Sequence, residues 1–182
     1  MKFKLLVKAI LDTQQHLQQK ALQSVNQWLS IRNWLFGYYI VEYQQKGEDR
    51  AKYGDQLIRN LSIELKAQGV KGMSFTNLNL YRQFYHEYPQ IVQTVSEQLK
   101  NADFSLPKDF LLQKPSMSKN IQTVPEQLQR KIFANTLDSK ILIRHFSFSH
   151  FIELIKIGNR VKRAFYEIEA IKGNWSVRQL KR

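Results

Sequence analysis

The sequence predicts an all-α fold, and two observations support this prediction. Apolar residues recur every three or four positions through most of the chain, which is typical of the buried face of an amphipathic helix. Thr123 with Glu126 and Ser176 with Gln179 show the capping-box pattern of a helix N-terminus, in which Ser or Thr is followed three positions later by Gln or Glu. Runs of β-branched residues are short and never alternate strictly with polar residues, so we expect no sheet of any size.

The longest predicted helix begins near Leu17 and ends at Gly47. Glycine is favoured just past a helix C-terminus, and charged residues follow this one. The apolar positions of the segment are Leu17, Ala21, Val25, Trp28, Leu29, Leu35, Phe36, Tyr39, Ile40 and Tyr43. Their spacing predicts one continuous amphipathic helix.

Two helices joined by a turn follow, over 55–68 and 74–88. The turn at 69–73 contains two glycines, and Ser74 is a favoured N-cap residue. The second helix carries apolar and aromatic residues along one side, which are Leu78, Tyr81, Phe84, Tyr85 and Tyr88. At helical spacing such a row more often indicates a core than a base-stacking surface.

The middle of the chain is predicted to be a connector. Pro107, Pro115 and several Ser and Asn residues interrupt the helical period between 101 and 122. Thr123 and Glu126 then form a capping box, so a helix resumes. We therefore divide the chain into helical units of 1–100 and 123–182, joined by 101–122.

The C-terminal unit contains two further predicted helices. A short one is capped at Ser147 or Ser149, and the next is capped by Asn159 and extends to about Ile171. We expect the longer of the two to face the core with four residues, Val161, Ala164, Phe165 and Ile168.

The last ten residues, "GNWSVRQLKR", predict one more helix start. Ser176 and Gln179 form the second capping box, and Trp175 with Leu180 forms a hydrophobic staple. The segments 159–171, 172–175 and 176–182 thus repeat the helix, turn and capped helix of 55–88. Both units have the shape of a helix-turn-helix, whose second helix can enter the major groove of DNA.

Composition excludes several classes of protein. With 182 residues, 43% of them hydrophobic, the chain can bury a core. It has no cysteine, so it has neither disulfides nor thiolate metal sites. No apolar run approaches the roughly 18 residues of a membrane span, and we find no signal peptide. We expect a cytoplasmic protein without membrane contact.

The charge of the chain favours an anionic partner. The net charge is +13, and residues 140–182 contribute ten basic and three acidic side chains, an excess of +7. A concentrated basic field of this kind favours DNA over a simple solubility surface, because it releases counterions from phosphates. The residues expected to contact DNA are Arg160, Lys162, Arg163, Arg178, Gln179, Lys181 and Arg182 in the second unit, with Asn77, Asn79 and Arg82 in the first.

No catalytic, cofactor, metal or small-molecule site is expected. Phosphate-binding glycine loops and nucleophile motifs are missing from the sequence. Glu64 and Lys66 match the Glu-x-Lys pair of PD-(D/E)XK nucleases, which lies on a strand. Here the pair falls in a predicted helix, where residues two apart point in different directions. We therefore expect no enzymatic activity.

A second function remains open, that of a protein–protein interaction or dimerisation module. The long first helix would then supply the contact surface, with Trp28, Trp34 and Phe36. Composition alone does not separate this alternative from DNA binding.

Three stretches together resemble a known family. They are "YGDQLIRNLSIELKAQGVKGMSFTNLNLYRQFYHEYP", "FSFSHFIELIKIGNRVKRAFYEIEA" and "NWSVRQLKR". They resemble the N-terminal domain of bacterial YhcG-type proteins, although Phe148 stands where Trp is usual. In that family the domain has unknown function and precedes a C-terminal PD-(D/E)XK nuclease domain. The resemblance therefore implies a module that positions a nuclease, without the nuclease domain itself.

Overall fold

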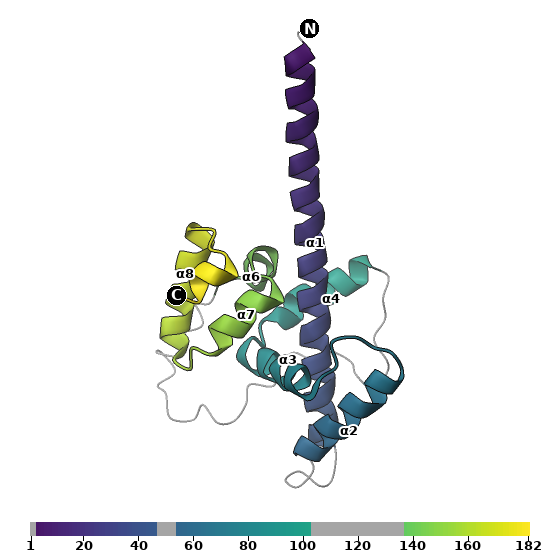
Figure 1. Cartoon of the computed structure of the whole chain (residues 1–182). Helices are drawn as coiled ribbons and strands as arrows, with labels where there is room; N and C mark the ends of the chain where they lie inside the picture. The colour runs from purple at the N-terminus through teal and green to yellow at the C-terminus, as the bar shows by residue number, and fades with distance from the viewer. Residues whose placement is uncertain (1–2, 47–53, 103–136) are drawn as a thin grey trace.

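The computed structural model describes residues 3–46, 54–102 and 137–182 (Figure 1). Every regular element within these ranges is a helix, which confirms the all-α prediction. The helices are α1 (Phe3–Lys46), α2 (Gly54–Ala67), α3 (Phe75–Glu87), α4 (Ile91–Asn101), α6 (Ser139–His145), α7 (Phe148–Ile155), α8 (Arg160–Lys172) and α9 (Val177–Leu180). None of them has the length and apolar character needed to cross a membrane.

The fold is organised around α1, which is much longer than the other helices (Figure 1). Its C-terminal half is packed against α3, α6 and α7, whereas its N-terminal half extends beyond them (Figure 1). The close crossing of α1 and α3 depends on Gly37, because a Cβ at that position would overlap the backbone carbonyl of Tyr81.

The main core joins helices from both ends of the chain. It contains buried side chains from α1, α3, α4, α6, α7 and α8, and the largest of those that are fully buried are Trp34, Tyr88, Phe84, Phe151, Ile91, Leu142 and Leu154. The Nε1 group of Trp34 donates a 2.9 Å hydrogen bond to the backbone carbonyl of Tyr88. Trp34 is fully buried, so its expected role in a contact surface is wrong.

A smaller cluster holds α2 against α1 and α3. It consists of Ile40, Ile58, Met73, Leu78 and Tyr81, with Phe36 partly buried against it. The Ser62 hydroxyl donates a 2.6 Å hydrogen bond to the carbonyl of Met73, which ties the turn to α2. Phe36 therefore belongs to this cluster and not to an exposed interaction surface.

The predicted helix starts at Ser74, Ser147, Asn159 and Ser176 are confirmed, whereas the predicted start of the first helix near Leu17 is wrong, because α1 already begins at Phe3. Ser74 accepts a hydrogen bond from the amide of Asn77, and Ser147 is the N-cap of α7. The capping box of Ser176 and Gln179 is also formed. The predicted connector lies outside the described residues except for its first two, and the helix start at Thr123 lies wholly outside them.

Two helices, α4 and α6, were not identified from the sequence. The signal for α4 was present, because Ile91, Val95 and Leu99 are spaced as on a helix and all three are buried. The signal for α6 was weak, since a helix of seven residues capped by Asp138 spans barely two turns.

The inward face expected for α8 is wrong. Val161 is 69% exposed and Phe165 is 59% exposed. The buried residues of this helix are instead Arg163, Glu167 and Ala170. The spacing of the apolar residues predicted that the opposite side of α8 is buried. That prediction failed because the buried side carries two ionisable groups, whose partners lie at the end of another helix.

Candidate nucleic-acid interface

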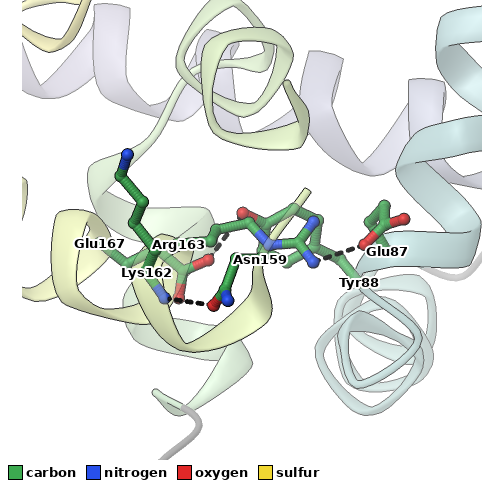
Figure 2. A network of polar contacts seen from close by, with 6 residues as sticks. All are labelled: Glu87, Tyr88, Asn159, Lys162, Arg163 and Glu167. Carbon is green, nitrogen blue, oxygen red and sulfur yellow. Dashed lines mark hydrogen bonds and ion pairs between the residues drawn. The ribbon is translucent and has the colours of Figure 1, made fainter. Parts of the chain in front are cut away.

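Arg163 on α8 anchors the C-terminal helices to the end of α3. Its Nη2 atom forms a 2.5 Å ion pair with Oε2 of Glu87, and its guanidinium lies 5.4 Å from the ring centre of Tyr88 (Figure 2). The side chain is buried, with the residue only 4% exposed. Arg163 is therefore an internal partner of Glu87 and Tyr88, and the expectation that it contacts phosphate is corrected.

Glu167 is the second ionisable residue on the buried side of α8. The hydroxyl of Tyr88 donates a 2.7 Å hydrogen bond to its Oε1 atom (Figure 2). Burial raises the pKa of Glu167, and the Tyr88 hydrogen bond and the charge of Arg163 only partly oppose this rise. Burial also raises the pKa of Tyr88, helped by the neighbouring Glu167 carboxylate. Tyr88 therefore remains a hydrogen-bond donor.

His150 fixes the turn that precedes α9. The backbone N–H of Ser147 donates to its Nδ1 atom at 3.2 Å, and Nε2 donates to the carbonyl of Trp175 at 3.1 Å. This pattern requires the neutral imidazole with the proton on Nε2. Burial lowers the pKa of His150, and the hydrogen bond to Trp175 partly opposes this. His150 is therefore part of the N-terminal cap of α7.

The short helix α9 is held by the staple that the sequence predicted. Trp175 and Leu180 are both partly buried against the main core. The amide of Ser176 donates to Oε1 of Gln179 at 2.8 Å. Packing on both sides of the cap explains why four residues form a helix here, since so short a helix is not stable by itself.

The exposed cations of α8, α9 and the C-terminus, apart from Lys172, define a basic surface, which consists of Lys162, Arg178, Lys181 and Arg182. None of the four forms an ion pair with any residue that the structure describes. Lys162 points away from the buried network, although its backbone amide donates to Asn159 (Figure 2). Arg160 is half-buried, and its charge lowers the pKa of Glu167 in opposition to the dominant effect of burial.

Two other exposed cations in this part of the chain are paired with neighbouring carboxylates. Lys156 pairs with Glu153 at 2.8 Å, and Lys172 pairs with Glu169 at 3.0 Å. The basic surface is therefore smaller than the charge count of 140–182 suggested, and it is concentrated at the α8 N-terminus and around α9.

The amide side chains expected to read bases are all engaged locally. Nδ2 of Asn77 donates to the carbonyl of Gly72 at 3.1 Å, and Nδ2 of Asn79 donates to the carbonyl of Phe75 at 3.0 Å. Oε1 of Gln179 accepts from Ser176. Arg82 is half-buried on α3. The structure places Asn77, Asn79 and Arg82 on α3, a different helix from those that carry the basic surface.

Comparison with known proteins identifies the family. The model of the DUF1016 N-terminal domain matches residues 8–106, which is more than half of the chain. The chain belongs to the DUF1016 N-terminal domain family. It is also 34% identical over 165 residues to a protein of Escherichia coli (strain K12) named "Putative nuclease YhcG". That alignment covers 90% of this chain and 39% of the relative, so the chain spans well under half of the relative's length. No solved structure matches the chain.

The DUF1016 match and the basic surface occupy different parts of the molecule. The matched residues include nearly all of α1 and the whole of α2, α3 and α4, whereas the basic surface lies beyond residue 106. Glu87 and Tyr88 lie within the matched segment. They bind Arg163 and Glu167, which lie outside it. The DUF1016 segment therefore supplies the platform on which α8 is oriented.

The Glu-x-Lys pair of the DUF1016 segment lies on a helix, as the sequence predicted, and not on a strand. Glu64 and Lys66 lie on α2 and both are exposed. Oε1 of Glu64 accepts a 2.9 Å hydrogen bond from Gln68 on the same helix. Among the described residues, no group of three or more acidic or histidine side chains is positioned to hold a metal ion.

Proposed function

We propose that this chain is a nucleic-acid-binding module whose basic surface contacts the phosphate backbone. The observation that carries the proposal is the group of exposed cations on α8, on α9 and at the C-terminus that form no ion pair with the described residues, Lys162, Arg178, Lys181 and Arg182. A cation already paired with a carboxylate must lose that partner before it binds phosphate. Unpaired cations release counterions from DNA without this loss.

Binding is proposed to be largely independent of sequence. Bidentate recognition of adenine by Asn or Gln uses both the oxygen and the nitrogen of the amide. In Asn77, Asn79 and Gln179 one of these two atoms is already bonded within the protein. Cations remain the groups best placed for binding, and their contacts with phosphate carry no sequence information.

The exposed apolar residues of α8 extend the proposal to unpaired bases. Val161 and Phe165 lie one turn apart on the exposed side, beside Lys162. An exposed aromatic ring next to cations is the arrangement on which single-stranded nucleic acid stacks. A single-stranded probe therefore belongs in the binding test beside a duplex.

The relative named as a nuclease suggests what the binding serves. In a longer protein, a module that holds DNA without sequence preference would raise the local concentration of DNA at an attached nuclease domain. We propose this positioning role for the DUF1016 N-terminal domain, with no cleavage by the present 182 residues.

A salt titration tests the proposal. Four phosphate contacts predict a slope of log affinity against log salt of about −4 on duplex DNA. Replacing Lys181 and Arg182 by Ala should flatten the slope by about 1 to 2 units. The matched control replaces Lys66 and Lys71 by Ala, two exposed cations on and beside α2. An equal loss in both double variants would show that net charge, rather than this surface, attracts DNA.

A further inference from the structure

The helix α8 turns its apolar side toward solvent. Val161, Phe165 and Ile168 fall within an arc of about 60° at 100° per residue. Val161 and Phe165 are exposed, and Ile168 is half-buried. These three residues are called the outer stripe. Phe165 lies two residues from both Arg163 and Glu167, which places it on the opposite side of the helix from these two buried groups.

Polar contacts keep α8 in this orientation. Arg163 forms an ion pair with Glu87 on the inner side of the helix (Figure 2). On the same side, Glu167 accepts a hydrogen bond from Tyr88. A helix that served stability alone would bury its apolar side and expose its charged groups. Departures from that pattern are expected at functional sites, so the outer stripe is a candidate contact surface.

The ring of Phe165 is oriented before any partner binds. It makes a T-shaped contact with the ring of Tyr166, with 5.7 Å between the two centroids. Tyr166 is itself partly buried against the main core. The contact restricts the side-chain rotations of Phe165, which lowers the entropic cost of stacking another ring on it.

The charge beside the Phe165 ring is positive. Lys162 lies three residues before Phe165, which makes the two side chains neighbours on the helix surface. Lys162 forms no ion pair within the described part of the chain. The exposed side of α8 also carries Glu169 and Lys172, and these two pair with each other at 3.0 Å. Lys162 is therefore the charge that this side offers to a partner.

We propose that the outer stripe binds single-stranded nucleic acid, with one unpaired base stacked on Phe165 and a neighbouring phosphate bound by Lys162. This role rests on the nucleic-acid-binding function proposed above and makes single strands the preferred substrate. Bases inside a duplex are already stacked on one another, so their faces cannot reach a ring on a protein surface. Unpaired bases stack readily on exposed aromatic side chains.

Other partners match the outer stripe less well. Lys is depleted in protein–protein interfaces, and Lys162 borders the Phe165 ring. In a two-fold dimer through the outer stripe, the Lys162 side chains of both copies would lie in one interface, where like charges repel. An anionic strand is instead attracted by the same lysine.

Fluorescence anisotropy with the whole chain tests the proposal, using a labelled single-stranded oligonucleotide and a duplex of equal length. Phe165→Ala should weaken single-strand binding by about 5- to 150-fold, the value of one stacked base, and duplex binding by less than about twofold. The slope of log affinity against log salt should not change, because no charge is removed. The matched control is Tyr43→Ala on α1, which removes another exposed aromatic ring and should leave both affinities unchanged.

Two further variants separate stacking from simple apolar contact. Phe165→Trp should retain single-strand binding, whereas Phe165→Leu should lose it as Phe165→Ala does. Thermal unfolding confirms that each variant folds, as the exposure of Phe165 predicts. Equal losses on both probes in Phe165→Ala, or full single-strand binding by Phe165→Leu, would overturn the stacking role. The salt slope on duplex DNA would then still support the basic surface, whereas no binding to either probe at low salt would reject both proposals.

Discussion

The hydroxyl of Tyr88, at the end of α3, donates a 2.7 Å hydrogen bond to Oε1 of Glu167 in α8. The two residues are 79 positions apart in the sequence and both are buried. This contact joins the DUF1016 segment to the helix that carries Lys162. The orientation of the basic surface therefore depends on polar groups inside the protein.

Tyr88→Phe should lower the free energy of unfolding by about 1–3 kcal/mol, because it leaves the buried Glu167 without its hydrogen-bond donor. The aromatic contacts of Tyr88 with Phe84 and Phe151 are retained in the variant. Urea denaturation measures the change. Tyr43→Phe is the control, since Tyr43 is 61% exposed and should change stability by less than about 0.5 kcal/mol.

Glu167→Gln should alter the pH dependence of stability. Because burial raises the pKa of Glu167 above 4.5, the unfolded chain ionises first and stability falls as pH rises from 4.5 through the folded pKa. Gln keeps an acceptor for Tyr88 and does not ionise. The free energy of unfolding, measured from pH 4 to 8, should therefore increase in the variant relative to the unmodified protein as pH rises. A constant difference over that range would contradict the raised pKa.

His150→Gln should reduce the loss of stability in acid. Burial lowers the pKa of His150 below 6.5, so its neutral form stabilises the fold above pH 6.5 and the contribution is lost as pH falls below that value. Gln at the same N3 position can still accept from the Ser147 amide. The drop in unfolding free energy between pH 7 and pH 5 should be smaller in the variant.

The predicted effect of His150 on stability in acid needs one control. Desolvation and the charge of Arg82 also lower the pKa of His86, which titrates in the same direction. His86→Gln, measured alone and combined with His150→Gln, separates the two contributions. Equal acid sensitivity in the unmodified protein and in His150→Gln would place the effect at other groups.

Gly37→Ala should destabilise the fold, although Ala normally favours a helix by about 0.5–1 kcal/mol over Gly. The added Cβ would overlap the carbonyl of Tyr81, and overpacking of this kind costs about 1–3 kcal/mol or more. Gly158→Ala is the control, because nothing lies within 4 Å of the position its Cβ would take. Thermal unfolding should show a lower midpoint for the first variant alone.

The sequence by itself determined the helical class and many of the helix boundaries. Ser74, Asn159 and Ser176 cap helices through bonds to amides three positions later in the chain. Such interactions are local, so their pattern can be read without knowing the fold. The spacing of Glu64 and Lys66 on a helix was predictable for the same reason.

Only the tertiary structure decided which side of each helix is buried. On α1 the apolar residues Val25 and Trp34 lie on opposite sides, and contact with α3 determines that Trp34 is the internal one. On α8 the side with Arg163 and Glu167 is buried, because Glu87 and Tyr88 compensate for the desolvation of the two groups. These partners are 76 and 79 residues away in the sequence. No local pattern records so distant a partner, since burial of a charged group depends on which groups the folded chain brings beside it.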